Sequence, residues 1–523
     1  MYSRLFNTHM QITQITNWIN EQSKLLFYSI LGIGALGFVA SLISSPALGI
    51  TITLAAIAVW LAIIKPELLV ALLALYIPFE PFVLKYIPDD IYIYMRYASE
   101  LMIYILLGAA LLSRLRNQTK LTWGPAGIWL PLFVASLVMS AVLNSVEITT
   151  ATLGIRQIIR FMLLYLAVIN LPIKKDFAKI LVWLLIGMAV FQSLIGLSQA
   201  VIGSPADSLL IPSEERSFGS VLLTPGTDQF WTGGQRVTAT MGRYDQLGTF
   251  LSFILLIVVG LLYEHPRFKT KRYLLAGLMV GLGALVLTYS RASWFGFLLG
   301  LIAITVFLKR DRKVIGIGLL IVVALAIYPM VTSLVVDDLI DQPDMPIVSR
   351  LYEAFSYERW RSEYYGLGRM YFIVETVTKV WPASPIYGFG PGQYGGGATA
   401  ALGNTAVYDQ LGIPFGIFGY TGQIDNNWLS LLGETGLVGV SLFGLILLNL
   451  MCYAWKIFKN NQDRMVAGVA LGLIGAIVSV IFEAGLGTHF EVRTLGVYLW
   501  LLPALLFIMA KPEGKNNEYS PGQ

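Results

Sequence analysis

The sequence is short of charge, cysteine and histidine. Only 13% of its 523 residues are Asp, Glu, Lys or Arg, about half of the ~25% that is usual in soluble domains, whereas 56% are hydrophobic and the mean hydropathy is +0.69. This composition excludes a water-soluble globule, a disordered chain and, despite a net charge of +5, a nucleic-acid-binding protein. The single Cys452 excludes a disulfide framework and a thiolate metal cluster. The three histidines, His9, His265 and His489, are far apart in the sequence, which argues against a zinc site.

Long apolar runs fill most of the chain instead. A run of about 17–25 apolar residues crosses the ~30 Å hydrocarbon core of a bilayer as a helix, so we expect an all-α polytopic membrane protein with about 12–14 transmembrane helices. The candidate spans are 25–43, 47–64, 68–84, 99–113, 127–144, 157–171, 180–202, 246–263, 274–289, 294–308, 314–336, 428–455, 465–486 and 495–510. The first span lacks a small-residue cleavage site, which favours a retained anchor over a removed signal peptide.

The distribution of charge predicts the orientation of these spans. With the N-terminus in the cytoplasm, 22 Lys and Arg and 8 Asp and Glu fall inside, against 14 and 23 outside. This asymmetry follows the positive-inside rule and places both termini in the cytoplasm. The predicted domains are a cytoplasmic segment 1–24, helices one to eleven over 25–336 with an outer loop at 203–245, a large periplasmic loop 337–427, helices twelve to fourteen over 428–510, and a cytoplasmic tail 511–523.

The large outer loop has features of ordered structure. Loops longer than about 15 residues are usually functional or disordered, and in this loop Met370, Ile373, Val377 and Val380 have helical spacing, with Pro382 ending the run. The spacing predicts a helix over 366–381. The glycine-rich sequence GFGPGQYGGG that follows is able to present backbone N–H groups.

The basic residues expected outside are mostly arginine. They comprise 12 Arg and 2 Lys, whereas the inner side has 8 Arg and 14 Lys. Because arginine is favoured where phosphate or carboxylate is recognised by two parallel hydrogen bonds, this bias indicates a site for an anionic lipid headgroup. The alternative is simple pairing with the outer carboxylates.

Five of these arginines stand at the expected ends of spans. Arg156 and Arg160 are four residues apart and share one helical face, where they either extend to the membrane interface or bind a diphosphate. Arg236 and Arg243 flank VTATMG, next to Asp245. Arg291 lies in the short turn TYSRAS and has no acidic neighbour in sequence, which favours a ligand-binding role over pairing with a distant acid.

Further candidates come from the large loop and from its C-terminal end. Arginines among many aromatic residues at 350–381 suit sugar rings, although such aromatics equally form an interfacial belt or the core of the loop. The sequence DNNWLSLLGETGLVG places Asp425, Asn426 and Asn427 at the outer mouth of a span and Glu434 about two turns inside. An intramembrane carboxylate is a functional candidate by default.

Three of these motifs, taken in order, resemble a known family. They are similar to motifs of the O-antigen ligase/polymerase superfamily of bacterial envelope glycosyltransferases. The three motifs are Ser290-Arg291, the sequence GRMYFIVETVTKVWPASPIYGFGPGQY at 368–394 and the sequence NNWLSLLGETGLVG at 426–439. The resemblance covers about 236–445, and the plan of many spans with one large outer loop before the last few spans also matches.

The resemblance implies a membrane-embedded C-type glycosyltransferase in the bacterial inner membrane, with inverting, metal-independent chemistry and no cofactor. The implied donor is a glycan on undecaprenyl diphosphate, and the implied acceptor is another glycan or lipid A core, with membrane lipid and with export or chain-length proteins as partners. By position, Arg291 and Arg369 are the arginines expected at the diphosphate. Arg156, Arg160, Arg236 and Arg243 are supporting candidates from their charge and location.

One motif departs from the family. The family commonly has His-Asn where this chain has Asn426-Asn427, and that histidine assists attack by the acceptor hydroxyl. Asn takes no proton at neutral pH, so Asn426 is expected to orient the acceptor. The general base is then Asp425, Glu434, or His489 together with Glu491 in the last outer loop. Alternatively, His489 is an interfacial residue without a catalytic role.

The sequence therefore predicts a polymerase or ligase of lipid-linked glycan, with a slight preference for a polymerase or exopolysaccharide-type enzyme because of the missing histidine. The alternative is a transporter or flippase of a lipid-linked glycan or small solute. Transporters commonly place binding charges near the midplane on broken helices and in inverted repeats. Here the unusual charges gather at the outer ends of the spans and no repeat is visible. A non-catalytic scaffold for envelope assembly is a third reading.

Overall fold

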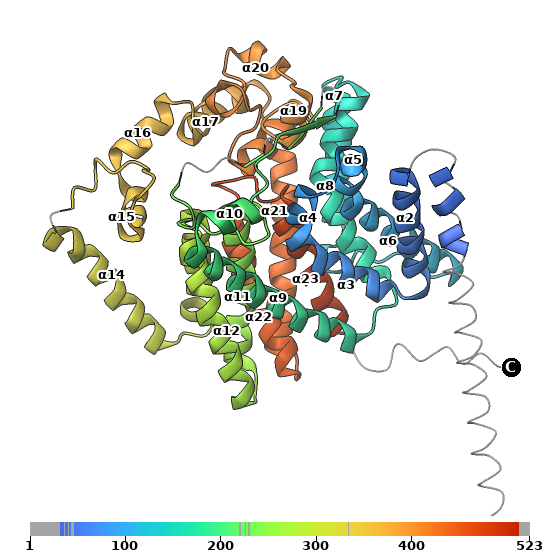
Figure 1. Cartoon of the computed structure of the whole chain (residues 1–523), viewed down its shortest axis with the longest axis horizontal. Helices are drawn as coiled ribbons and strands as arrows, with labels where there is room; N and C mark the ends of the chain where they lie inside the picture. Colours follow the sequence, from blue (N-terminus) through green and yellow to red (C-terminus); the bar gives the residue numbers. More distant parts are fainter. Residues whose placement is uncertain are drawn as a thin grey trace, which may run out of the picture.

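A computed structural model describes residues 32–511 except 36, 40, 43–45, 219–220, 225, 228–230 and 333. Three predicted parts of the chain lie wholly or mostly outside the described residues: the segment 1–24, most of the span 25–43 and nearly all of the tail 511–523. The rest of the chain forms a helical bundle capped at one end by short helices and loops (Figure 1).

The predicted all-α membrane fold is confirmed. Among the described residues ten helical segments are long and apolar enough to cross a membrane, and three shorter apolar helices accompany them. Each predicted span from 47–64 to 495–510 coincides with one of these segments. A helix satisfies all of its own backbone hydrogen bonds, which is why apolar runs of this length fold in this way in lipid.

The helices of the bundle have the following bounds: α2 (Pro46–Ile64), α3 (Pro66–Tyr76), η1 (Ile77–Phe79), α4 (Glu80–Lys85), α5 (Asp89–Arg96), α6 (Ala98–Arg116), η2 (Gly124–Ala126), α7 (Trp129–Leu143), α8 (Ile148–Asn170), α9 (Lys175–Ile202), α11 (Tyr244–Glu264), α12 (Phe268–Leu287), α13 (Arg291–Ile302), the π-helical η3 (Ala303–Leu308), α14 (Arg312–Thr332), α21 (Asn427–Asn460), α22 (Arg464–Glu483) and α23 (Arg493–Met509).

Helices α11, α22 and α23 form the buried centre of the bundle (Figure 1). Glycines allow α11 and α22 to approach closely, because a Cβ atom on Gly260 would lie 2.3 Å from the carbonyl oxygen of Gly468. Two turns further along α22, a Cβ on Gly300 of α13 would lie 2.5 Å from the carbonyl oxygen of Gly475. Small residues at such contacts are typical of packing between membrane helices.

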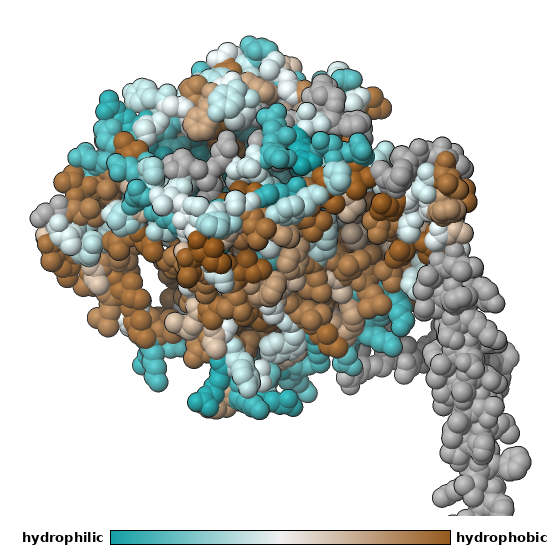
Figure 2. Space-filling view, in the orientation of Figure 1, coloured by the Kyte–Doolittle hydropathy of each residue, from teal (hydrophilic) through white to brown (hydrophobic). Residues whose placement is uncertain are grey.

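The two ends of the bundle differ in character. At one end, here called the basic side, Lys179 pairs with Asp463 at 2.7 Å, and Glu264 pairs with Lys309 at 2.5 Å and with Arg464 at 3.0 Å. These contacts join segments that were predicted to lie together on the cytoplasmic face. The opposite end, which carries residues 337–427, is here called the loop side. Figure 2 shows a hydrophobic belt between the two polar ends.

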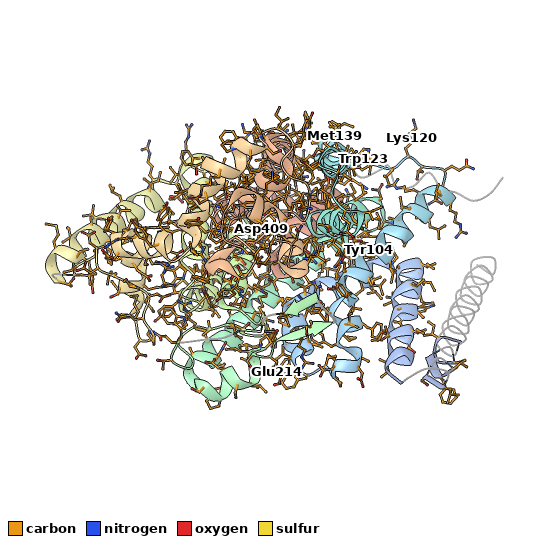
Figure 3. The ribbon with its side chains drawn as sticks, turned by 90° about the horizontal axis from the view of Figure 1, so that it is seen from above. Tyr104, Lys120, Trp123, Met139, Glu214 and Asp409 are labelled. Atoms are coloured by element: carbon orange, nitrogen blue, oxygen red, sulfur yellow. The ribbon has the colours of Figure 1, made fainter. Side chains whose placement is uncertain are left out.

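The loop side is covered by short elements. They are α10 (Ser204–Leu210), the antiparallel strands β1 (Arg216–Phe218) and β2 (Val221–Thr224), α15 (Ile347–Tyr352), η4 (Glu353–Phe355), α16 (Tyr357–Tyr365), α17 (Arg369–Glu375), the π-helical η5 (Thr376–Val380), α18 (Trp381–Ala383), α19 (Gly397–Leu402), α20 (Ala406–Leu411) and η6 (Ile417–Gly419). Viewed from this side, Asp409 of α20 lies over the middle of the bundle and Glu214 near its rim (Figure 3).

The predicted helix over 366–381 forms, with two differences. It begins at Arg369, and its second half is the π-helical turn η5. The wider turn changes the phase of the helix, so that Phe372 and Val380 are buried while Val377 is 44% exposed. The helical spacing of Met370, Ile373 and Val377 therefore does not mark a single buried face.

Helix α14 stands apart from the bundle at the left of Figure 1, and Figure 2 shows an open gap between this helix and the neighbouring helices. It has no buried residues. Its loop-side half is held by Tyr352, whose ring stacks on Tyr328 at 5.8 Å and whose hydroxyl donates to the carbonyl oxygen of Leu325 at 2.5 Å. A membrane helix exposed all round leaves room for lipid on both of its flanks.

Candidate active site

Glu353 is the centre of an arginine network on the loop side. This carboxylate is fully buried, and it pairs with Arg291 at 3.4 Å, with Arg359 at 3.3 Å and with Arg350 in a closer contact. Arg291 reaches it from the first residue of α13, where Tyr289 adopts a positive φ of 54° and so turns the chain sharply into the helix. Arg291 thus has the distant acidic partner that the sequence left open as the alternative to a ligand-binding role, and this partner is Glu353.

A second carboxylate, Asp341, extends the network to the loop before α11. It pairs with Arg350 at 2.8 Å and with Arg236 at 3.3 Å. The guanidinium of Arg236 lies 3.3 Å from the ring centroid of Trp231 and 4.3 Å from that of Tyr244, and the residue is only 2% exposed. Burial lowers the pKa of Arg236 to about 10. Since aromatic rings and an acid cover this guanidinium, Arg236 holds the two outer loops together.

Arg369 and Asp425 form the most open of these ion pairs. Nε and Nη2 of Arg369 donate to Oδ2 of Asp425 at 3.2 and 3.0 Å, and the two side chains are 34% and 38% exposed. The nearby Arg243 is 50% exposed and binds both carboxylate oxygens of Asp245 at the start of α11, with Nε donating to Oδ1 at 3.0 Å and Nη2 to Oδ2 at 3.2 Å. Partly exposed guanidiniums of this kind are available to an anionic ligand.

His489 is buried beside these two ion pairs. Burial lowers its pKa to about 4, and the charged groups that act on the imidazole are Asp245, Asp425, Arg369 and Arg243. The ring is therefore neutral at pH 7 and able to accept a proton. The structure brings together His489, Asp425, Arg369 and Arg243, four residues that the sequence named separately.

Asn426 and Asn427 hold the turn that carries His489. Asn426 is the N-cap of α21, where its side-chain oxygen accepts from the N–H of Leu429 at 3.0 Å and its amide donates to the carbonyl oxygen of Gly485 at 2.8 Å. The backbone N–H of Asn427 donates to the carbonyl oxygen of Ala484 at 2.8 Å, and its side-chain oxygen accepts from the N–H of Phe490 at 2.8 Å. Both asparagines thus position the residues on either side of His489.

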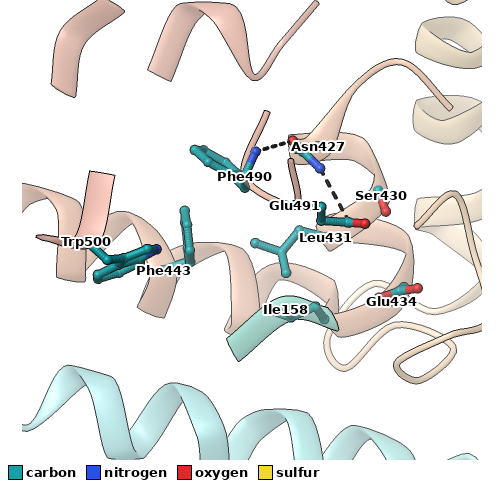
Figure 4. A pocket seen from close by; sticks show the side chains of 9 residues that line it. All are labelled: Ile158, Asn427, Ser430, Leu431, Glu434, Phe443, Phe490, Glu491 and Trp500. Atoms are coloured by element: carbon teal, nitrogen blue, oxygen red, sulfur yellow. Dashed lines mark hydrogen bonds between the residues drawn. The ribbon is translucent and has the colours of Figure 1, made fainter. Parts of the chain in front are cut away.

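Glu434 and Glu491 lie deeper, around a small cavity of about 20 Å³ that Asn427 and Ser430 also line (Figure 4). The glycine-rich segment donates its backbone N–H groups to these acids, from Gly392 to Glu434 at 2.9 Å and from Gly397 to Glu491 at 2.8 Å. The glycine-rich segment thus presents backbone N–H groups, as the sequence indicated, and those of Gly392 and Gly397 are directed inward to acids of the protein itself. Burial raises the pKa of Glu491.

Arg156 and Arg160 share one helical face, as predicted, and both reach Glu100 at the start of α6. Arg156 binds it through two hydrogen bonds of 2.5 and 3.0 Å, and Arg160 lies 3.5 Å from it. Arg160 also donates to the backbone carbonyl oxygen of Glu491 at 2.6 Å. These two arginines thus support the Glu491 turn from below and lie apart from the exposed Arg369–Asp425 pair.

A cleft of about 350 Å³ opens on the loop side above the Arg369–Asp425 pair. Besides these two residues it is lined by Arg359, Ser362, Glu363, Gly366, Gly368, Ile417 and Phe418. Glu363 joins two of its walls, because it pairs with Arg359 and accepts from the backbone N–H of Arg369 at 2.8 Å. The cleft has a size typical of small-ligand sites.

Several residues of this site were not named from the sequence. Glu353, Asp341 and Glu363 are the acids that organise the arginines, and Phe418 lines the cleft. The acids are among the outer carboxylates that the sequence offered only as general partners, and a single sequence does not show which acid meets which arginine. In the part of the chain that the structure describes, no three His, Cys, Asp or Glu side chains are grouped to hold a metal ion.

Comparison with known proteins agrees with the motif resemblance. Residues 276–444 match the family model described as O-antigen ligase. A search of curated proteins found no match. The matched segment contains Arg291, Glu353, the cleft, Asp425 and Glu434. The chain therefore carries an O-antigen ligase domain over residues 276–444, and this match supports the resemblance to the O-antigen ligase/polymerase superfamily.

Proposed function

We propose that the protein transfers a glycan from a polyprenyl-diphosphate carrier to an acceptor hydroxyl on the outer face of the inner membrane. The observation that supports this most directly is the grouping of the partly exposed Arg369–Asp425 and Arg243–Asp245 pairs with the neutral, buried His489, next to a cleft that Arg369 and Asp425 line. Cations for a diphosphate and a base for a hydroxyl are the two requirements of this reaction.

The donor diphosphate would bind to Arg369 and Arg243, with Arg291 behind them. Each guanidinium is already held by a carboxylate, so an arriving diphosphate shares or replaces that carboxylate at a preformed cation. The prenyl tail would remain in the membrane, in the gap beside α14, which lies below the Glu353 network. Lateral entry from the bilayer spares the long apolar tail any contact with water.

In the reaction itself, the oxygen of the acceptor hydroxyl attacks the anomeric carbon and the bond from that carbon to the phosphate oxygen breaks. The diphosphate leaves with the electron pair, and Arg369 and Arg243 stabilise the charge that develops on it. The hydroxyl proton passes to Nε2 or Nδ1 of His489, with Asp425 as the second candidate base. A single displacement of this kind inverts the anomeric configuration, and in this mechanism no metal ion takes part.

Asn426 and Asn427 would act as positioning residues. They fix the 484–490 turn through four hydrogen bonds of 2.8 to 3.3 Å, counted from their backbone and side-chain groups to Ala484, Gly485, Gly487 and Phe490. In this proposal His489 takes the role of the histidine that the family commonly has at position 426. His489 lies in the 484–490 turn, which Asn426 and Asn427 hold at the N-terminal end of α21. Glu434 and Glu491 anchor the glycine-rich segment beneath the reacting groups.

Deletion of the gene, followed by analysis of envelope glycans, tests the proposed function. Accumulation of single carrier-linked repeat units indicates a polymerase, which we favour. Long carrier-linked polymer without attachment to lipid A indicates a ligase. Unchanged glycans with altered solute uptake would contradict the proposal and favour the transporter.

The proposal also includes an inner-membrane location, cytoplasmic termini and a periplasmic loop side. Accessibility labelling of single cysteines placed at Thr119 and Thr405, in a Cys452→Ser background, tests this orientation.

A further inference from the structure

Phe418 stands at the edge of the 350 Å³ cleft with its ring largely in solvent. It is 59% exposed, and its neighbour Tyr420, which is 74% exposed, stacks on it with ring centroids 6.3 Å apart and an interplanar angle of 29°. Two large aromatic rings exposed side by side next to a polar cleft are unusual, because burial of such rings is favourable.

The backbone that presents Phe418 is strained. Phe418 and Leu367 both have positive φ, at 59° and 57°, a region that side chains other than Gly, Asn and Asp rarely adopt. The two residues are joined directly, since the N–H of Phe418 donates to the carbonyl oxygen of Leu367 at 3.1 Å. Glycines flank both positions, at Gly366, Gly368 and Gly419. Backbone strain of this kind is concentrated at ligand-binding and catalytic sites.

The polar walls of the cleft carry both hydrogen-bond donors and acceptors. Arg359 and Arg369 supply guanidinium groups, and Glu363 and Asp425 supply carboxylates, so the charges balance. Away from the Arg369–Asp425 pair, the carboxylate of Glu363 disfavours a polyanionic ligand, whereas a ligand with several hydroxyl groups both donates to Glu363 and accepts from Arg359. A pyranose ring combines such hydroxyls with an apolar face of C–H groups that packs on an aromatic ring.

We infer that this cleft is a glycan subsite in which Phe418 is the stacking platform for a pyranose ring and the Arg359–Glu363 pair binds its hydroxyls. This inference rests on the proposed function and names the part of the site that binds sugar. Because the cleft ends at Arg369 and Asp425, a sugar in it lies next to the residues proposed to bind the diphosphate and to activate the acceptor.

Binding of a carrier-free oligosaccharide tests the inference. The probe is the repeat-unit oligosaccharide released by mild acid from the lipid-linked glycans of the host, titrated into the full chain in lipid nanodiscs. We expect Phe418→Ala and Phe418→Gly to weaken binding about tenfold, the typical worth of one aromatic contact, and Phe418→Tyr to retain it. The Gly variant controls for folding, because glycine adopts the positive φ of this position without strain. Tyr357→Ala, an exposed aromatic residue of the same loop that does not line the cleft, is the matched control and should bind like the wild type.

Two outcomes overturn the inference: no binding of the oligosaccharide to the wild type at millimolar concentration, or equal binding by the wild type and both the Ala and Gly variants. Failure of the proposed function looks different. If Arg291→Ala and Arg369→Ala retain full glycan transfer while oligosaccharide binding still depends on Phe418, the glycan subsite stands and the reaction site lies elsewhere.

Discussion

Arg369 and Asp425 meet through two hydrogen bonds to one carboxylate oxygen, at 3.2 and 3.0 Å, on the floor of an open cleft. The sequence allowed two explanations for the arginines of this face: pairing with acids or binding of an anionic ligand. In Arg369 both explanations apply to the same side chain. The acid orients the guanidinium, and the open edge of the pair leaves it accessible to a diphosphate.

The first prediction concerns the shape of this guanidinium. Arg369→Lys keeps the positive charge and loses the planar fork, so we expect glycan transfer to fall by roughly a hundredfold, a loss typical of one removed transition-state donor. Arg361→Ala is the control, because this 53% exposed arginine pairs with Glu358 at 3.1 Å and does not line the cleft. Transfer measured in membrane vesicles with equal protein content checks both. Wild-type transfer by the Lys variant would show that charge alone is sufficient.

The second prediction concerns the stability of the Glu353 network. Glu353→Gln removes a fully buried carboxylate from Arg291, Arg350 and Arg359, and breaking a buried pair in this way costs about 3–5 kcal/mol of unfolding free energy. We expect a lower thermal unfolding midpoint in detergent and faster proteolysis between α14 and α17. Glu358→Gln, at an exposed pair, should change the midpoint very little. Equal midpoints for the two variants would contradict the importance of Glu353.

The third prediction concerns pH and His489. Because the pKa of His489 falls to about 4 in the folded protein from 6.5, the unfolded chain binds the proton more readily between these values, and stability decreases as the pH falls from 6.5 to 4. The contribution of His489 to the free energy of unfolding is at most about 3 kcal/mol. His489→Gln should flatten the dependence of the thermal midpoint on pH in this window, whereas His265→Gln should flatten it less, because the pKa of His265 is also lowered by burial but this residue is only half-buried. An unchanged slope in His489→Gln would mean that the imidazole is not buried as described.

The same variant tests the catalytic role. Removal of a general base usually lowers the rate by 10² to 10⁴-fold, so His489→Gln should retain carrier-linked donor binding and lose most transfer at pH 7. Asn426→His restores the residue that the family commonly has and should not rescue it, because Asn426 caps α21 and holds Gly485. Restored transfer in the double variant would assign the base to position 426.

The fourth prediction concerns the glycine-rich segment. A Cβ on Gly388, where φ is +66°, would lie 2.5 Å from backbone atoms of Glu434 and Thr435, whereas a Cβ on Gly412, where φ is +60°, would meet nothing within 4 Å. Gly412→Ala should therefore cost only the ~1 kcal/mol of a strained φ. Gly388→Ala should cost more and should reduce transfer, because it separates the segment from α21. Similar losses in both variants would contradict this packing.

Much of the fold was predictable from local patterns. Apolar runs located the spans from 47–64 to 495–510, as at 465–486 and α22, because a membrane helix depends on the hydropathy of its own residues. The π-helical turn at Thr376–Val380 and the ribbon of β1 and β2 were not predicted, since tertiary packing decides them.

The sequence predicted several residues of the site but not the contacts between them. Arg291, Arg369, Asp425 and His489 were named from position and motif. Their partners were not, because Arg291 and Glu353, or Arg369 and Asp425, are some 60 residues apart and meet only through the fold. The exposed ring of Phe418 gave no signal in the sequence, since its strained backbone depends on the contact with Leu367.

The most direct test of the account is glycan transfer by Arg291→Ala and Arg369→Ala, measured with the carrier-linked donor in reconstituted membranes alongside the thermal midpoint of each variant. The account predicts that both variants fold and that both lose transfer, because the leaving diphosphate no longer meets its cations. Full transfer by both folded variants would contradict it.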